Sequence, residues 1–291
     1  MYHAGSANEA IRIAVVTREQ AIAIARQIGP PALKFAASIV APLYWVGRNP
    51  DGTLFTRNGT AFFLQTHEAL FGVTAAHVIE GENSWRNHCE QYGRTPVRLG
   101  GREGTSVQFD WDARCVDINL DMDIATFMVS PREVQQINRT IYSGLQTRWP
   151  PDPPAEKQGI MYAGFPGHET RQLSRLSLQF GIACGAGLVD SVSPRNVSSL
   201  IEREYLEPAL GQGIPPENYD YGGISGGPML YNLLTTQGIF VTALAGVIYS
   251  GPNISEDQNQ AISGFELFRA RPATYIRADG FLEHDLWAQS Q

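Results

Sequence analysis

Short apolar segments separated by turn-forming residues dominate the chain from residue 32 onward. Gly, Pro and Asn cluster between neighbouring segments, and no repeat of fixed period is present. This pattern favours a protein built from many short β-strands joined by turns. The predicted strands are Ser38–Val46, Gly59–Gln65, Leu70–Thr74, Pro96–Leu99, Val107–Asp112, Ile124–Val129, Gly159–Phe165, Leu176–Cys184, Pro228–Tyr231, Ile239–Tyr249 and Ala261–Glu266.

Both ends of the chain and one insertion have helical character instead. In residues 7–28 a capping-box pattern, T-x-x-Q, precedes an Ala- and Ile-rich run, and we expect Gly29-Pro30-Pro31 to end this helix. A second helix is predicted over Val197–Leu206, inside an insertion at about 191–218. The tail Pro272–Trp287 has the composition of a third.

A proline-rich segment divides the strands into two groups. Proline has no N–H to donate, so the segment Arg148-Trp-Pro-Pro-Asp-Pro-Pro154 cannot continue a sheet. Two β-rich halves joined in this way suggest two packed barrels. The predicted units are an N-terminal helical extension (1–31), a first barrel (32–148), a linker (149–158), a second barrel (159–268) and a C-terminal helical tail (269–291).

Composition and charge narrow the classes of partner. The formal net charge of −7 offers no electrostatic attraction to nucleic acid. No apolar run is long enough to span a membrane, and the start does not have the pattern of a signal peptide. Cys89, Cys115 and Cys184 form no C-x-x-C motif. We therefore expect a cytoplasmic protein without cofactor or metal and without nucleic-acid or membrane partners.

Two segments place a histidine and an acid beside apolar strands. In one, a strand runs into two alanines and then His77, a candidate general base with small neighbours. In the other, Asp123 leads directly into the strand Ile124–Val129, and a carboxylate so placed can accept from an imidazole Nδ1–H. A structural histidine and a turn aspartate are the plainer interpretations of each alone. Asp117 and Asp121 are rival acids, and Asp123 is preferred because it abuts the strand.

A third segment, Gly222-Gly-Ile-Ser-Gly-Gly-Pro228, surrounds Ser225 with four glycines. Glycine permits backbone angles that aim successive N–H groups at one point, as an oxyanion hole requires. A plain glycine-rich turn is the alternative. A phosphate loop is disfavoured, because G-x-x-x-x-G-K-[ST] does not occur.

Taken together, TAAHV, DIATFMV and GISGGPM follow one another in an order that resembles the chymotrypsin/trypsin-like serine peptidases. The resemblance implies two packed Greek-key β-barrels and an endopeptidase. It implies that Ser225 is the nucleophile, His77 the general base and Asp123 the residue that orients His77. The N–H groups of Gly223 and Ser225 would form the oxyanion hole.

The same resemblance extends to the substrate side. Ala245-Gly-Val-Ile-Tyr-Ser-Gly251 is similar to the strand that runs beside the substrate, so Tyr249, Ser250 and Gly251 are expected to bind it. Tyr219 and Asp220 would lie near the base of the primary specificity pocket. A tyrosine floor favours small or apolar side chains, whereas an inward Asp220 would favour Lys or Arg.

Two positions depart from the secreted enzymes of this family. Val78 follows His77 where those enzymes have a cysteine, so the disulfide made by that cysteine is excluded. The turn in Tyr162–Gly167 is similar to that of bacterial relatives of the HtrA type. Ile224 stands where they carry an aspartate that pairs with a newly cleaved N-terminus. We therefore expect an oxyanion hole that is either preformed or ordered by a protein partner.

Other interpretations stay open. The serine segment also satisfies the G-x-S-x-G pattern of α/β-hydrolases, but that fold needs its histidine after the serine, and only His284 follows. A catalytically silent trypsin-like fold that binds proteins is the main alternative, and a protease latent until activated is another. A metal site is disfavoured, since the histidines are dispersed and form no H-E-x-x-H.

Overall fold

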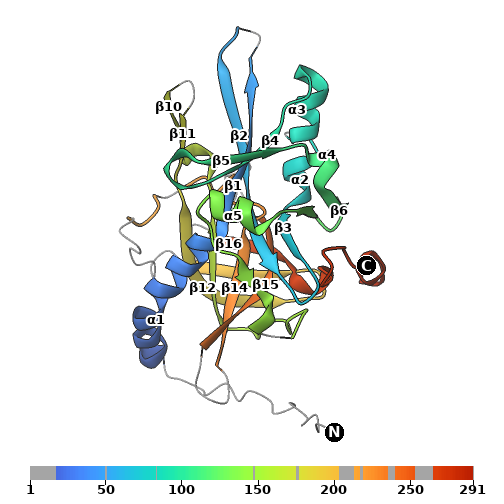
Figure 1. Cartoon of the computed structure of the whole chain (residues 1–291). Coiled ribbons are helices and arrows are strands. Elements are labelled where there is room, and N and C mark those ends of the chain that lie inside the picture. Colours follow the sequence, from blue (N-terminus) through green and yellow to red (C-terminus); the bar gives the residue numbers. More distant parts are fainter. Residues whose placement is uncertain are drawn as a thin grey trace, which may run out of the picture.

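The computed structural model describes residues 18–49, 51–82, 84–146, 148–174, 177–202, 213–216, 219–234, 240–252 and 265–290. Strands make up most of its regular structure (Figure 1), which confirms the predicted all-β class. The strands are β1 Val40–Arg48, β2 Leu54–Gln65, β3 Leu70–Thr74, β4 Val97–Gly100, β5 Ser106–Phe109, β6 Cys115–Asn119, β7 Ile124–Met128, β8 Tyr142–Ser143, β9 Gly159–Gly164, β10 Thr170–Ser174, β11 Ser177–Phe180, β12 Ala183–Val192, β13 Val197–Glu202, β14 Pro228–Leu234, β15 Phe240–Ser250 and β16 Phe265–Pro272. The α-helices are α1 Arg18–Ile39, α2 Ala76–Ile79, α3 Trp85–Tyr92, α4 Trp111–Arg114, α5 Pro131–Gln136 and α6 His284–Gln289.

The first half of the chain forms one sheet with the order β5-β4-β1-β2-β3-β7-β6. Within it, β4-β1-β2-β3 are antiparallel neighbours, which is the Greek-key order. The two ends of the path, β5 and β6, follow each other in the chain with α4 between them. The sheet therefore curls around its own apolar interior.

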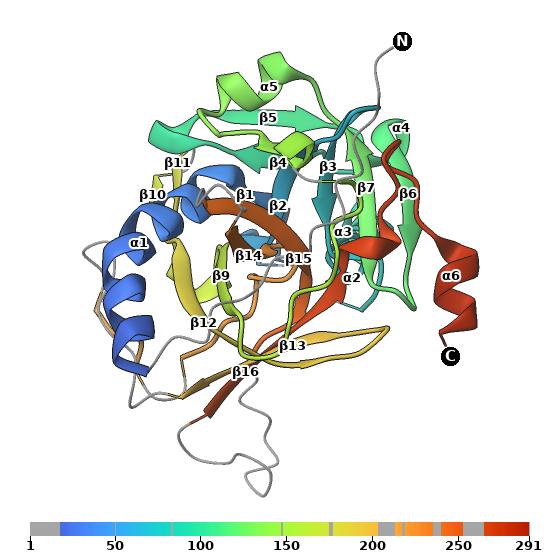
Figure 2. The ribbon, with the colours of Figure 1, turned by 90° about the horizontal axis from the view of Figure 1, so that it is seen from below.

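The second half forms a closed barrel of β12-β13-β16-β15-β14-β9. Here β14-β9-β12-β13 repeat the same antiparallel Greek-key order. Figure 2 shows the barrel strands from below, with α1 lying against β9 and β12. The predicted Greek-key organisation is thus confirmed in both halves, and the described residues 148–158, which contain no helix or strand, connect them.

The predicted end of the N-terminal helix at Gly29-Pro30-Pro31 is wrong. Residues 7–17 lie outside the described residues, and α1 continues through both prolines to Ile39. Beyond the prolines, Leu33, Ala36 and Ile39 recur at helical spacing and are buried in the core between the two halves. The free energy gained by burying this apolar stripe outweighs the cost of the helical hydrogen bonds lost at the two prolines.

The helix predicted over Val197–Leu206 is also wrong where the structure describes it. Residues 197–202 form β13, which pairs with β12 on one side and β16 on the other, and residues 203–206 lie outside the described residues. Two ladders of backbone hydrogen bonds override the local helical composition. In the tail, β16 runs to Pro272, beyond the predicted barrel end at residue 268, and among residues 272–287 only the last turn, α6, is α-helical.

The buried apolar side chains of the described residues group into three clusters. One lies inside the first sheet and one inside the barrel, and the third combines side chains of both halves, such as Phe62 and Leu64 with Met161 and Leu230. The two halves therefore share a buried seam, and polar side chains at its edge can come from either half. None of the helices in the described ranges has the length and apolar character needed to cross a membrane.

Candidate active site

His77 lies in α2, the single helical turn that follows β3. Ala75 and Ala76 are buried, whereas the His77 side chain is 47% exposed. The small alanines pack the turn against the first sheet and leave the ring at the surface. The ring is therefore available both to a neighbouring acid and to an incoming group.

The structure brings Asp123 to His77. One carboxylate oxygen lies 2.8 Å from His77 Nδ1, and the other accepts from the His77 backbone N–H at 2.9 Å. Asp123 has a φ of 58°, in the left-handed region that aspartate tolerates better than most residues. A carboxylate at Nδ1 holds the proton there and leaves Nε2 free to accept one.

Neither rival acid contacts His77. Asp117 Oδ2 lies 2.9 Å from His284 Nε2 and accepts from the Leu282 backbone N–H at 3.0 Å, so it faces the C-terminal segment. Asp121 is exposed. The chain thus contains a second His–Asp pair, which joins β6 to α6.

Ser225 lies in the glycine-rich turn before β14, and this turn packs on the first sheet. Gly226 has a φ of 89°, and a Cβ built there would come within 2.0 Å of Thr60 O and 2.8 Å of the Ala75 nitrogen. Because Ala75 is two residues from His77, the serine turn and the His77 turn meet at the seam. The Ser225 hydroxyl donates to Tyr249 O at 3.4 Å, and no hydrogen bond joins it to His77 in the described structure.

The backbone donors of the turn fall into two groups. The N–H groups of Ile224, Gly226 and Gly227 donate to carbonyls at 2.7–3.0 Å. Within the described part of the chain, the N–H groups of Gly223 and Ser225 have no acceptor. Gly223 has a φ of 99°, which only glycine adopts readily. The two unpaired donors are those that the sequence pattern assigned to an oxyanion hole.

The predicted substrate-side residues lie around the same turn. The Tyr249 side chain is engaged by two residues: its hydroxyl donates to Asn196 Oδ1 at 2.8 Å, and the Arg271 guanidinium lies 3.9 Å from its ring centroid. Ser250 closes β15 and is half-buried. A Cβ on Gly251 would lie 3.2 Å from the Tyr221 side chain. Buried side chains, among them Tyr221 and Phe268, therefore flank this strand end.

Tyr219 and Asp220 are both engaged locally. The Tyr219 hydroxyl donates to Glu169 Oε1 at 3.0 Å, and burial together with this carboxylate raises the Tyr219 pKa above its usual value. Asp220 Oδ1 accepts from the Gly222 backbone N–H at 2.7 Å. The Asp220 carboxylate thus caps its own turn.

Other contacts of the site had no local signal in the sequence. Thr60 and Asn58, both on β2, hydrogen-bond to the serine turn and to Phe165 across more than a hundred residues of chain. Arg271 Nε donates to Met122 O at 2.9 Å, next to Asp123. Only the packing of the two halves creates these contacts.

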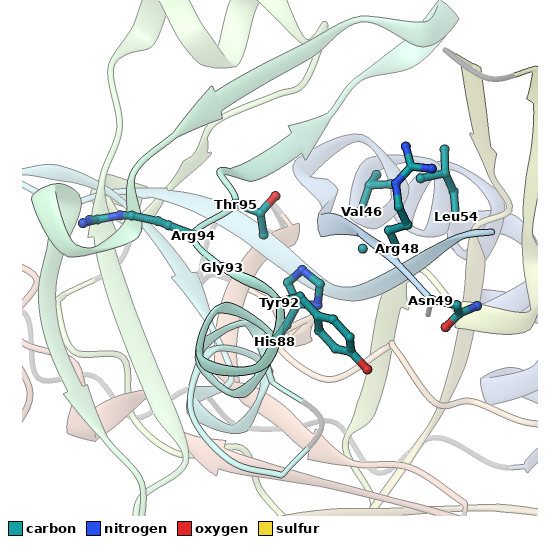
Figure 3. Close-up of a pocket in the computed structure, with 10 residues that line it drawn as sticks. Val46, Arg48, Asn49, Leu54, His88, Tyr92, Gly93, Arg94 and Thr95 are labelled. Carbon is teal, nitrogen blue, oxygen red and sulfur yellow. The ribbon is translucent and has the colours of Figure 1, made fainter. Parts of the chain in front are cut away.

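A separate depression of about 530 Å³ lies between β1 and α3 (Figure 3). Its lining includes Arg48, His88 and Tyr92 and none of the predicted site residues. The His88 ring stacks on Tyr92, and burial lowers the His88 pKa. Among the described residues, no three His, Cys, Asp or Glu side chains are grouped as metal ligands would be.

No family model and no curated protein matches the sequence. Among solved structures, one similar chain is the serine protease domain of the Sesbania mosaic virus polyprotein, with 14% identity, a TM-score of 0.40, and coverage of 82% of this chain and 90% of that one. A second comes from work on aromatic interactions that drive the coupled folding and binding of the intrinsically disordered VPg protein of the same virus. It has 16% identity, a TM-score of 0.40, and coverage of 83% and 98%.

Proposed function

We propose that the chain is a serine endopeptidase in which Ser225, His77 and Asp123 act as a catalytic triad. The observation that carries this proposal is the meeting of two features at one seam. One is the His77–Asp123 pair, with 2.8 Å between Nδ1 and Oδ2. The other is the serine turn, whose Gly223 and Ser225 N–H groups lack acceptors among the described residues.

The chemistry would follow from these positions. His77 Nε2 takes the proton of the Ser225 hydroxyl as the oxygen attacks the scissile carbonyl, and Asp123 stabilises the imidazolium that forms. The carbonyl oxygen becomes an oxyanion that accepts from the N–H groups of Gly223 and Ser225. Collapse breaks the C–N bond, and His77 gives its proton to the leaving amine. Water then attacks the acyl-enzyme by the same route and restores the serine.

The substrate is proposed to be a protein or peptide with a small or apolar side chain before the scissile bond. Aromatic side chains flank Gly251, whereas Asp220 is exposed and its Oδ1 accepts from the Gly222 backbone N–H within its own turn. A cleavage profile on a peptide library tests this preference. Strict cleavage after Arg or Lys would contradict it.

The proposed setting is the cytoplasm, with a dedicated protein target, in a bacterial-type enzyme that lacks the disulfide beside the catalytic histidine. Cys89, Cys115 and Cys184 are free thiols, as expected where thiols are kept reduced. Val78 packs on Gly59, where a Cβ would come within 2.5 Å of its side chain. An apolar contact thus occupies the place of that disulfide.

A catalytically silent, protein-binding version of the fold is the second candidate. It is favoured by one observation, that the Ser225 hydroxyl bonds to Tyr249 O and not to His77. In free enzymes this bond is often long and tightens only when substrate binds. The two candidates therefore differ in reactivity.

A fluorophosphonate probe, which labels activated serines covalently, separates the two candidates. We expect labelling of the wild-type chain, none of Ser225→Ala, and wild-type labelling of Ser193→Ala, which removes an exposed serine in the β12–β13 turn. Equal labelling of wild type and Ser225→Ala would remove Ser225 as nucleophile. Labelling of neither, with both chains folded, would favour the binding module or a latent enzyme.

A further inference from the structure

We propose that Thr60 is a positioning residue that, together with Gly167, holds the oxyanion-hole peptides of the serine turn in their working orientation. The site would then need neither a cleaved N-terminus nor an activating partner. This inference rests on the proposed peptidase function and deepens it, because it concerns how that site is regulated.

The first step concerns the Gly222–Gly223 peptide. Gly222 O accepts from the Gly167 backbone N–H at 2.6 Å. In a planar trans peptide the C=O and N–H point in opposite directions. The bond from Gly167 therefore directs the Gly223 N–H away from the Gly167 turn. A flipped peptide would lose this bond.

The second step concerns the two peptides that flank the Ile224–Ser225 peptide. The Thr60 hydroxyl donates to Gly223 O at 2.8 Å, and the Thr60 backbone N–H donates to Ser225 O at 2.9 Å. The same hydroxyl accepts from the Phe165 N–H at 2.9 Å. One residue of β2 thus holds the carbonyls on both sides of the Ile224–Ser225 peptide, which carries the second donor of the hole.

The third step is steric. Thr60 has no solvent exposure. A Cβ on Gly223 would lie 2.7 Å from Phe165 O and 3.0 Å from Asn58 Nδ2, so the turn is in close contact with its supports. Asn58 Nδ2 also donates to Phe165 O at 2.7 Å. The serine turn, the Phe165–Gly167 turn and β2 therefore interlock.

The fourth step concerns charge. Ile224, directly before the nucleophile, is fully buried in the barrel core, and its side chain would lie 2.3 Å from a Cβ on Gly164. A carboxylate there would need a cation, as it does in the secreted enzymes that this sequence resembles. The neutral bonds from Thr60 and Gly167 and the burial of Ile224 do not depend on a new terminal ammonium.

The test compares the intact wild-type chain with three variants, each carrying a single substitution. Thr60→Val is nearly isosteric, removes the hydroxyl bonds to Gly223 and Phe165, and leaves the backbone N–H to Ser225 in place. Thr60→Ser keeps the hydroxyl. Thr66→Val is the matched control, since Thr66 is also buried and its hydroxyl donates to Ala278 O and accepts from the Ala69 N–H, away from the serine turn.

We expect the intact wild-type chain to react with a fluorophosphonate without proteolysis or partner. Loss of one oxyanion-hole donor lowers kcat by about 10²–10³. In Thr60→Val both donors remain but are held less firmly, so we expect a smaller loss, about 10- to 100-fold, in the labelling rate and in kcat. KM should change little. A peptide boronate, whose tetrahedral adduct uses the hole, should lose affinity by a similar factor. Thr60→Ser should recover most of the rate. Thr66→Val should lower the melting temperature comparably but keep the rate.

Wild-type rates in Thr60→Val would overturn the inference. So would loss of activity in Thr66→Val equal to that in Thr60→Val, because the effect would then follow stability. If the intact wild-type chain does not react but does after limited proteolysis or on addition of cell extract, this inference fails and the peptidase survives. If it reacts under neither condition, the proposed function fails as well.

Discussion

Two His–Asp pairs of nearly the same geometry allow a direct test of which carboxylate serves the proposed reaction. The closest N···O distance is 2.8 Å for His77–Asp123 and 2.9 Å for His284–Asp117. The side-chain exposures are 47% and 15% in the first pair and 48% and 17% in the second. Asp123→Asn and Asp117→Asn are therefore matched perturbations that differ mainly in where the histidine lies.

The expected size of the Asp123→Asn effect follows from the contacts. The Asp123 carboxylate accepts from both the ring and the backbone of His77. An asparagine amide facing Nδ1 would donate to it, move the ring proton to Nε2, and leave no base for Ser225. In triads of this kind the loss is about 10⁴ in kcat, or about 5 kcal/mol of transition-state stabilisation.

Asp117→Asn should leave kcat within about threefold of wild type, because the Asp117 carboxylate pairs with His284 and accepts from the Ile118 and Leu282 backbone N–H groups. A partly exposed pair of this kind contributes about 1 kcal/mol to stability. The assay is kcat for an ester or peptide substrate at pH 8, with the fluorophosphonate labelling rate as a substrate-independent check and thermal unfolding as the stability control. Retention of kcat within tenfold in Asp123→Asn, or an equal loss in Asp117→Asn, would refute the assignment.

Three further predictions concern stability and reactivity. Gly226→Ala should abolish labelling and lower the free energy of unfolding in urea by about 2–4 kcal/mol, because the added Cβ would clash with Thr60 O. The control, Gly104→Ala, has a similar φ but open space around it and should cost only about 1–2 kcal/mol. Equal costs for the two variants would contradict the steric argument. Burial lowers the His88 pKa, so below about pH 6.5 the unfolded chain binds a proton at His88 more readily than the folded chain does. The free energy of unfolding should therefore fall as the pH drops from 7 to 5. His88→Phe should reduce that fall, and an unchanged pH dependence of unfolding would argue against a neutral buried ring. Burial raises the Cys184 pKa to about 11, so alkylation by iodoacetamide at pH 8, followed by mass spectrometry, should be slower for Cys184 in the native than in the unfolded chain, and equal rates would show the thiol to be accessible.

The strands were largely accessible to prediction because their signals are local. Leu70–Thr74 was predicted with the bounds that the structure gives β3, and Gly159–Phe165 differs from β9 by one residue. Apolar runs between turn residues mark such segments wherever they later pair. β6 was missed, since its polar residues Asp117 and Asn119 break the pattern, and both are used by contacts with other parts of the chain.

The helical segments were predicted less well because burial and pairing decided them. The prolines at 30 and 31 signal an end to a helix, yet the apolar stripe that follows is buried against the core and keeps α1 helical. Residues 197–202 lie between two strands of a closed barrel, and that position imposes the extended form. Neither neighbour is visible in a window of sequence around these residues.

The sequence by itself determined the all-β class and the turns that carry His77, Asp123 and Ser225, because strand alternation and glycine-rich turns are properties of adjacent residues. Only the tertiary structure decided that Asp123 and not Asp117 contacts His77, and that the Thr60 hydroxyl bonds to Gly223, 163 residues away. Which donors and acceptors become partners depends on where the two halves meet. That seam is set by the packing of side chains from both halves, and no local pattern encodes it.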